Sequence, residues 1–330
     1  IADADMPYVN GLELARLLRT NHRTAHVPII MLSPHKEVDS ILAGHIENAD
    51  EFLPKPVELS ILLEKIEQLL RGSRSINRLK FRRQPGKVVV FFRGKGGAGA
   101  STLAVNSAVA LALSKSHRVS LLDLNLEFGS TSMMLDVRPE KTLADLNGVS
   151  VAELEDADFA RLTAKHPSGV RLVVASDLPE KAELVSIAAV NQTLDVLRHQ
   201  SDFVFVDLAP SFSELNLGVL DAADTICLVT TPHFVPLKAT IDCLHVFDKL
   251  KFPTDRLLLF LNRTTPAGLE NEQVAKIIHQ VPDLVIPYTS QFDDAADSGQ
   301  PVVIGNPQGA AAVAIRDLAA KIANLVPAKV

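Results

Sequence analysis

RGKGGAGAST, residues 93–102, follows an apolar run at residues 88–92 and leads into a helical pattern that starts at residue 103. A strand, a glycine-rich turn and a helix in this order bind phosphate, because the backbone N–H groups of the turn and the positive end of the helix point at phosphate oxygens. Gly94, Gly99 and Ser101 meet the spacing G-x-x-x-x-G-x-S of such loops. Ala100 stands where these loops carry a lysine. The sequence therefore predicts a nucleotide site without the side chain that grips the terminal phosphates.

The residues of this glycine loop have separate expected roles. Its glycines let the backbone approach phosphate oxygens closely. Ser101 is placed to bind Mg²⁺, and Thr102 is placed to reach an inner phosphate. The predicted nucleotide-binding positions of the loop are Gly94, Lys95, Gly96, Gly97, Ala98, Gly99, Ala100, Ser101 and Thr102.

Polar residues end two later apolar strands. Asp207 follows the run at residues 203–206 and is expected to hold Mg²⁺ through water, with Ser101 as the other metal-binding residue. Asp123 and Asn125 lie at the end of an earlier run and are the predicted catalytic positions. Asn125 is degenerate in this role, because an amide cannot act as a base. Each aspartate alone fits a strand-end turn, but the loop and two strand ends in this order favour a nucleotide site.

Strands and helices alternate from residue 87 onward, which predicts an α/β fold with a doubly wound, mainly parallel sheet. The strands are short continuous apolar runs, as expected for strands covered on both faces. A helix at residues 310–325 has a thin basic face, Arg316 and Lys321, so we expect it to pack on its own domain, with a weak membrane contact as the alternative. The predicted strands are residues 87–92, 119–123, 171–174, 203–207, 225–230, 257–261 and 284–286.

Composition narrows the class of protein. The 330 residues have a formal net charge of −6, which argues against a protein that coats nucleic acid with its whole surface. No apolar run approaches the roughly 18 residues of a membrane span. The two cysteines, Cys227 and Cys243, lie in apolar surroundings, so we expect buried free thiols and a reducing cytoplasm.

Residues 71–86 separate two regions of different pattern, residues 1–70 and residues 87–330. Residues 71–87 hold seven basic residues and no acid. We favour a solvated connector over a patch for anionic lipid or nucleic acid, because charge runs are usually solvated. A helix is expected at residues 11–20, strands at residues 27–32 and 50–53, and an amphipathic helix at residues 59–70.

The first region resembles the receiver domain of response regulators, a flavodoxin-like fold. Asp3 lies three residues before Met6-Pro7, where that family has its phosphoacceptor. Ser33 follows a strand at the place of the switch hydroxyl, and Lys55 stands in the family's Lys-Pro pair. The resemblance implies that Asp3 accepts a phosphoryl group with help from Ser33 and Lys55. The family's first strand with its acidic pair is missing from this partial receiver domain, so we expect a segment before Ile1. A degenerate receiver used for docking or dimerisation is the open alternative.

The second region resembles the ParA/MinD superfamily, the deviant Walker A ATPases. Their loop K-G-G-x-G-K-[ST]-[ST] compares with residues 95–102, and their D-x-D motif compares with residues 123–125. Lys95 matches the signature lysine, which in the family crosses a dimer interface to the partner's ATP. The resemblance implies ATP and Mg²⁺ as ligands and a homodimer across the nucleotide site. Ala100 and Asn125 depart from the pattern, so we expect weak or absent ATP hydrolysis.

Within that superfamily the chain is most similar to the TadZ/CpaE pilus-assembly group, which joins a receiver-like domain to a ParA/MinD-type domain. By the same resemblance Asn262, Arg263 and Pro287 line the adenine pocket, with a structural loop role as the alternative. The group implies a cytoplasmic factor at a cell pole or membrane periphery, with the ATPase and polar machinery of a Flp/tad type IV pilus as partners. The matching stretches are residues 121–129, 135–136, 141–146, 166–169, 202–208, 261–263 and 286–288.

Three functions remain open on the sequence. The favoured one is an ATP-binding localisation or assembly factor whose dimer is controlled by nucleotide. The first alternative is an active MinD/ParA-like ATPase that cycles on membrane or DNA, and the second is a phosphorylation-controlled response regulator. Specific nucleic-acid binding is not expected, because no DNA-binding motif is evident.

Overall fold

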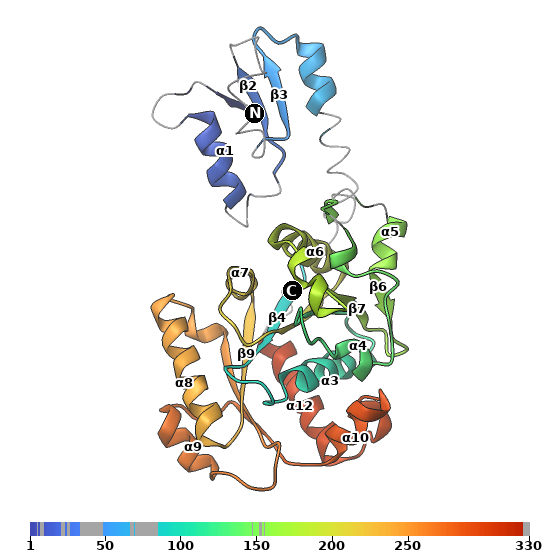
Figure 1. Ribbon diagram of the computed structural model, residues 1–330, viewed down its shortest axis with the longest axis vertical. Coiled ribbons are helices and arrows are strands. Elements are labelled where there is room, and N and C mark those ends of the chain that lie inside the picture. Colours follow the sequence, from blue (N-terminus) through green and yellow to red (C-terminus); the bar gives the residue numbers. More distant parts are fainter. Residues whose placement is uncertain are drawn as a thin grey trace. The chain divides into compact units, whose positions relative to one another are not determined.

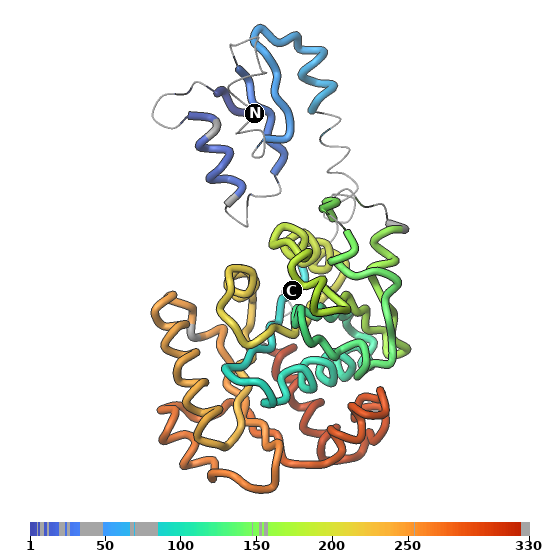
Figure 2. Tube along the Cα trace, viewed as in Figure 1, coloured from blue at the N-terminus to red at the C-terminus, as the bar shows by residue number. Residues whose placement is uncertain are grey.

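The chain forms two compact units, Ile1–Arg82 and Arg83–Val330, in the computed structural model. Figure 2 traces both units along the chain. The expected basic linker falls almost entirely outside the described residues, because only its last two positions are described. The described residues are 1–4, 6, 10–20, 24, 27–33, 49–66, 69, 85–146, 148–151, 154 and 156–325.

The first unit holds a parallel three-stranded sheet in the order β1-β2-β3, where β1 is Ala2–Asp3, β2 is Ile30–Ser33 and β3 is Glu51–Pro54. Helix α1 spans Gly11–Thr20, as the sequence predicts, and residues 59–66 are helical. Strand β2 begins three residues later than expected, because Val27 turns back onto Thr24 and a proline follows it. Ser33 is the last residue of β2 rather than the first residue after it.

The second unit is built on an eight-stranded sheet in the order β11-β10-β9-β4-β8-β5-β7-β6. Every expected strand forms, and seven of the eight strands run parallel. The sequence does not predict strand β6, because its residues form no apolar run. Strand β6 pairs antiparallel with β7. The strands are β4 Lys87–Phe92, β5 Val119–Leu124, β6 Thr163–Lys165, β7 Arg171–Val174, β8 Phe203–Leu208, β9 Thr225–Thr230, β10 Leu257–Asn262 and β11 Leu284–Ile286.

Helices cover both faces of this sheet (Figure 1). One buried cluster joins the sheet to α3, α11 and α12, and the other joins it to α6, α7, α8 and α9. No helix among the described residues is long and apolar enough to cross a membrane. The helices are α3 Ala100–Leu113, α4 Thr131–Met134, α5 Asp156–Arg161, α6 Ile187–Gln200, α7 Glu214–Asp221, α8 Phe234–Lys249, α9 Asn271–Ile278, α10 Gln291–Ser298, α11 Val302–Gly305 and α12 Ala310–Leu325.

Helix α12 packs against α3 on its own domain, as the sequence predicts. Ile315, Leu318 and Ile322 are completely buried, so the apolar stripe of α12 is used inside the fold. Both cysteines are buried free thiols, also as predicted.

Candidate nucleotide site

The carboxyl ends of the central parallel strands place the predicted site residues at one edge of the sheet. Asp123 on β5 and Asp207 on β8 are register partners, and Phe91 on β4 is the next partner of Asp207. Side chains alternate along a strand, so Asp123 and Asp207 share the face that α3 covers, together with Phe91 and Phe205. The fold therefore brings the glycine loop, the start of α3 and both aspartates together.

The glycine loop has the backbone conformation that its glycines predict. Gly97 has φ +81° and Gly99 has φ +83°, a left-handed conformation that L side chains rarely adopt. A Cβ atom at Gly99 would lie 2.4 Å from Asn262 Nδ2, whereas one at Gly96 or Gly97 would meet nothing within 4 Å. The loop is therefore closed on the Asn262 side and open at Gly96 and Gly97, where a phosphate has room to approach.

Ala100 begins α3 and is 1% exposed, packed in the apolar cluster that includes Phe91. Ser101 and Thr102 are half-buried in the first turn of α3, and Lys95 is exposed. No positive charge thus occupies the position of the missing lysine, and the exposed lysine precedes the turn.

Asp207 lies at the centre of the polar contacts. Its Oδ2 atom accepts a hydrogen bond of 2.6 Å from Ser101 Oγ, and its Oδ1 atom accepts one of 3.2 Å from Arg93 Nη1. Arg93 also donates to the carbonyl oxygen of Leu208 at 3.2 Å. No motif in the sequence assigns a role to Arg93. Arg93 comes two residues after Phe91, directly after β4, and this spacing is the signal that places it on the face of the two aspartates.

Burial dominates the electrostatics of the two carboxyls. The pKa of Asp207 is raised to about 7, mainly by desolvation and then by the neighbouring charge of Asp123, while Arg93 and the hydrogen bond from Ser101 act to lower it. Desolvation also raises the pKa of Asp123 above its ordinary value, opposed mainly by its hydrogen bond from Thr131. A buried carboxyl pair with raised pKa values is typical of a functional site, because the ionised pair needs a cation beside it.

Asp123 anchors the segment that follows β5. Its Oδ1 atom accepts a hydrogen bond from the backbone N–H of Asn125 at 3.0 Å, and its Oδ2 atom accepts bonds from Thr131 N and Oγ1 at 3.2 and 2.7 Å. The Asn125 side chain donates to the carbonyl oxygen of Phe128 at 3.2 Å. Asp123 therefore holds both ends of the loop at residues 125–131, and the side-chain amide of Asn125 donates a hydrogen bond within that loop.

The three expected adenine-pocket residues follow β10 and β11. Asn262 Nδ2 donates to the carbonyl oxygen of Ala98 at 2.9 Å, so Asn262 ties β10 to the glycine loop. Arg263 donates to Leu269 O and Asn271 Oδ1 at 3.0 and 2.8 Å, which braces its own loop. Pro287 is exposed directly after β11. The structure therefore joins Asn262 to the glycine loop, while the Arg263 side chain serves the loop after β10.

The residues present fit Mg²⁺ and a nucleotide phosphate. Mg²⁺ takes oxygen ligands and usually binds through one or two carboxylates together with substrate phosphates. Ser101 Oγ and Asp207 Oδ2 supply two such oxygens 2.6 Å apart. No cluster of three or more acidic, histidine or cysteine side chains that could cage a metal occurs within the described part of the chain.

A second expected site lies in the first unit. Lys55 Nζ donates to Asp3 Oδ2 across the carboxyl ends of the small parallel sheet. Ser33 is buried at the end of β2, the strand between β1 and β3. The three residues predicted from the receiver pattern thus lie at or directly after the carboxyl ends of three adjacent strands.

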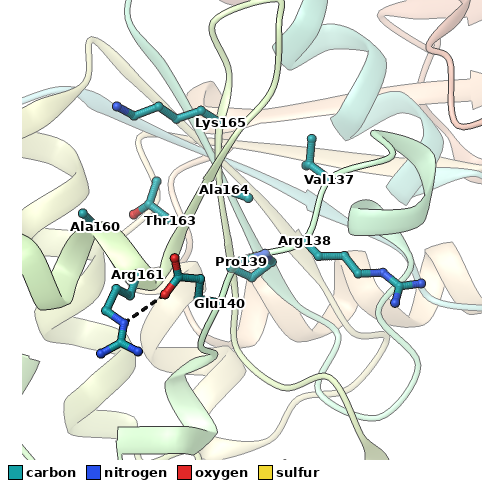
Figure 3. A pocket seen from close by; sticks show the side chains of 9 residues that line it. All are labelled: Val137, Arg138, Pro139, Glu140, Ala160, Arg161, Thr163, Ala164 and Lys165. Atoms are coloured by element: carbon teal, nitrogen blue, oxygen red, sulfur yellow. Dashed lines mark hydrogen bonds and ion pairs between the residues drawn. The ribbon is translucent and has the colours of Figure 1, made fainter.

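A groove at the β6 border of the large sheet holds none of the predicted site residues (Figure 3). It has a volume of about 410 Å³, and its exposed Arg161 and Glu140 form an ion pair of 3.0 Å. Arg138 and Lys165 point outward from it in different directions in Figure 3. The lining residues are Val137, Arg138, Pro139, Glu140, Ala160, Arg161, Thr163, Ala164 and Lys165.

Family models match both units. Residues 86–257 match the model described as an AAA domain, and residues 1–67 match the response regulator receiver domain. The chain belongs to the AAA domain family of ParA and MinD type, with a receiver domain before it. The expected α/β fold with a mostly parallel sheet is confirmed, as is the resemblance to ParA and MinD.

Three relatives illustrate the family. The sporulation initiation inhibitor protein Soj of Bacillus subtilis is 24% identical over 251 residues, covering 72% of this chain and 98% of Soj. A ParA family ATPase from Chlorobium tepidum has a TM-score of 0.66 at 25% identity, covering 72% of this chain and 98% of that one. MinD of Pyrococcus horikoshii, complexed with Mg-ADP, has a TM-score of 0.63 at 22% identity and covers 73% of this chain and 97% of its own. At this identity the likeness shows only that the two chains share a fold.

Binding of Mg²⁺ with nucleotide is expected to release protons near neutral pH. Asp207 has its pKa raised to about 7, and the metal takes the ionised form. Affinity should therefore rise from about pH 6 to about pH 8. The stability of the ligand-free fold depends on pH in the opposite direction. The contribution of Asp207 to the free energy of unfolding is full below its ordinary pKa and is lost as the pH rises through about 7. Calorimetry in two buffers of different ionisation enthalpy measures the release, and equal heats in both buffers contradict the prediction.

Proposed function

We propose that this chain is an ATP-binding localisation or assembly factor for a Flp/tad type IV pilus or a related secretion machine, with nucleotide-controlled dimerisation and weak or absent ATP hydrolysis. The observation that carries the proposal is the hydrogen bond from Ser101 to the buried Asp207 beside a glycine loop whose lysine position is the buried Ala100. The ParA/MinD-type family supplies the ATPase fold.

The groups that bind nucleotide are kept in this site, and two groups that speed hydrolysis are absent. The open loop at Gly96 and Gly97 and the hydrogen bond from Ser101 to Asp207 support binding of phosphate and Mg²⁺. Ala100 supplies no charge, and loss of one electrostatic stabiliser of a transition state commonly costs about 10²–10³ in rate. Asn125 cannot take a proton from water, and its amide donates to Phe128. These features support binding without rapid turnover.

Lys95 is the proposed link between two copies. Lys95 is exposed directly before the turn, whereas Ser101 is half-buried in the first turn of α3. An exposed side chain at this place is able to reach a second copy of the chain. Replacing Lys95 with alanine should leave nucleotide binding by the monomer within about threefold, because an exposed charge contributes little within its own chain. ATP-dependent dimers should be lost. Light scattering with and without ATP and Mg²⁺, alongside a nucleotide-binding titration, measures both effects.

Lys165→Ala is the matched control for Lys95→Ala. Lys165 is also an exposed lysine, but it pairs with the first residue of β7 and so lies at the opposite edge of the sheet. Its loss should leave the dimer unchanged. A wild-type protein that stays monomeric with ATP contradicts the dimer proposal, and rapid phosphate release that Lys95→Ala abolishes favours the alternative of an active cycling ATPase.

The pilus assignment, a polar position in the cytoplasm and partners in the secretion machine rest on the resemblance to the TadZ/CpaE group. The receiver domain before a ParA/MinD-type domain supports it. A fluorescent fusion of the full chain in its own cells, together with recovery of the secretion ATPase from those cells, tests this part. Uniform cytoplasmic fluorescence and no recovered secretion ATPase argue against it.

A further inference from the structure

A buried cation lies beside the acidic pair of the nucleotide site. Arg93 is 7% exposed, and Asp207 and Asp123 are 0% and 2% exposed. The Arg93 guanidinium bonds Asp207 directly, and its charge opposes the effect of burial on the pKa of both carboxyls. An unpaired buried charge is costly, so these three side chains form one interdependent unit.

This unit adjoins the place where phosphates are expected. Ser101, in the first turn of α3, donates to Asp207 Oδ2. The acidic pair is therefore in hydrogen-bond contact with the residue that follows the glycine loop and Ala100. An ionised carboxylate at this position repels a polyphosphate, and the repulsion is strong where water is excluded. A bound Mg²⁺ relieves it from outside the chain. Arg93 supplies one positive charge from within the chain, whether or not a metal is present.

Both oxygens of Asp207 are engaged by the protein itself. Arg93 holds Oδ1 at 3.2 Å, and Ser101 holds Oδ2 at 2.6 Å. A metal ion must compete with these two donors for the carboxylate. The same contacts that reduce repulsion toward phosphate therefore also reduce what Mg²⁺ adds to binding.

We propose that Arg93 is a tethered counter-ion of the nucleotide site and makes nucleotide binding only weakly dependent on Mg²⁺. The inference rests on the proposed nucleotide binding and deepens it. Arg93 is a positioning residue, because its side chain donates to Asp207 and to the carbonyl oxygen of Leu208.

The test is the loss of affinity for a fluorescent ADP analogue when millimolar Mg²⁺ is replaced by EDTA, measured on the full chain. Wild type should lose less than about tenfold, and Arg93→Gln should lose about 100-fold, because the acidic pair is then uncompensated. Arg93→Lys keeps the charge and should stay close to wild type. Arg118→Gln, which removes an exposed arginine paired with Asp202, is the matched control and should behave as wild type.

The outcomes separate this inference from the proposed function. If wild type loses about 100-fold or more of its affinity in EDTA, the inference is overturned while nucleotide binding stands. The inference is also overturned if the affinity of Arg93→Gln depends on Mg²⁺ no more than that of wild type. No binding by wild type with or without Mg²⁺ overturns the proposed function itself. If Arg93→Gln does not fold, wild type and Arg93→Lys decide: weak dependence in both supports the inference, and strong dependence in either overturns it.

Discussion

Replacing Gly99 with alanine should reduce nucleotide affinity by about 100-fold. Gly99 has φ +83°, where an L residue costs about 1–2 kcal/mol. The new Cβ would lie 2.4 Å from Asn262 Nδ2 and displace the amide that bonds Ala98 O, a contact worth about 1 kcal/mol. Together these costs come to about 2–3 kcal/mol, and each 1.4 kcal/mol is about tenfold in affinity, so the expected loss is of the order of 100-fold. Titration with a fluorescent ATP analogue measures the effect.

Gly148→Ala is the control for Gly99→Ala, because Gly148 also has a positive φ, +84°, and lies outside the predicted nucleotide-binding positions. A Cβ at Gly148 meets nothing within 4 Å. Its affinity should stay within about threefold of wild type, a difference below 1 kcal/mol. Equal losses in both variants would mean that a side chain at any left-handed glycine lowers affinity, and that the conformation at Gly99 has no special part in binding.

Restoring the two missing groups should raise ATP hydrolysis. The double variant Ala100→Lys with Asn125→Asp returns a positive charge to the loop and a carboxylate after β5. One electrostatic stabiliser is commonly worth about 10²–10³ in rate. A positioned proton acceptor adds about 10²–10⁴, so at least a 100-fold higher kcat is expected. Phosphate release at saturating ATP is the measurement.

Ala100→Met with Asn125→Asp is the control for the lysine. Ala100 is 1% exposed against the sheet, so any long side chain there must leave the apolar cluster. The methionine variant has a stem of similar length without the charge, and its rate separates the steric effect from the electrostatic one. A lysine variant no faster than the methionine variant contradicts the view that the missing charge limits hydrolysis.

The sequence predicts the second unit well because its signals are local. Continuous apolar runs mark every strand except β6, and glycines mark the turn after β4. Strand β6 is missed because Thr163, Ala164 and Lys165 have no apolar pattern, and only the hairpin with β7 makes them a strand. Its existence depends on tertiary pairing, which no local pattern reports.

The candidate site is predicted in its residue types but only partly in its contacts. The convergence of Ser101 with Asp207 follows because the loop after β4 leads into α3 beside the carboxyl end of β8, the neighbour of β4 in the sheet. The role of Arg93 does not follow from a motif, because a single arginine after a strand is usually a surface group. Thr131 is missed for a similar reason, since its bond to Asp123 depends on how the segment after β5 folds back.

The two edge strands of the large sheet affect how copies of the chain associate. Strands β11 and β6 are the outermost, and each is only three residues long. Such short borders offer few unpaired backbone groups, and Lys165 adds a charge at one of them. Joining of sheets edge to edge into continuous fibrils is therefore disfavoured. Association is left to side chains and loops, which a bound ligand is able to switch on and off.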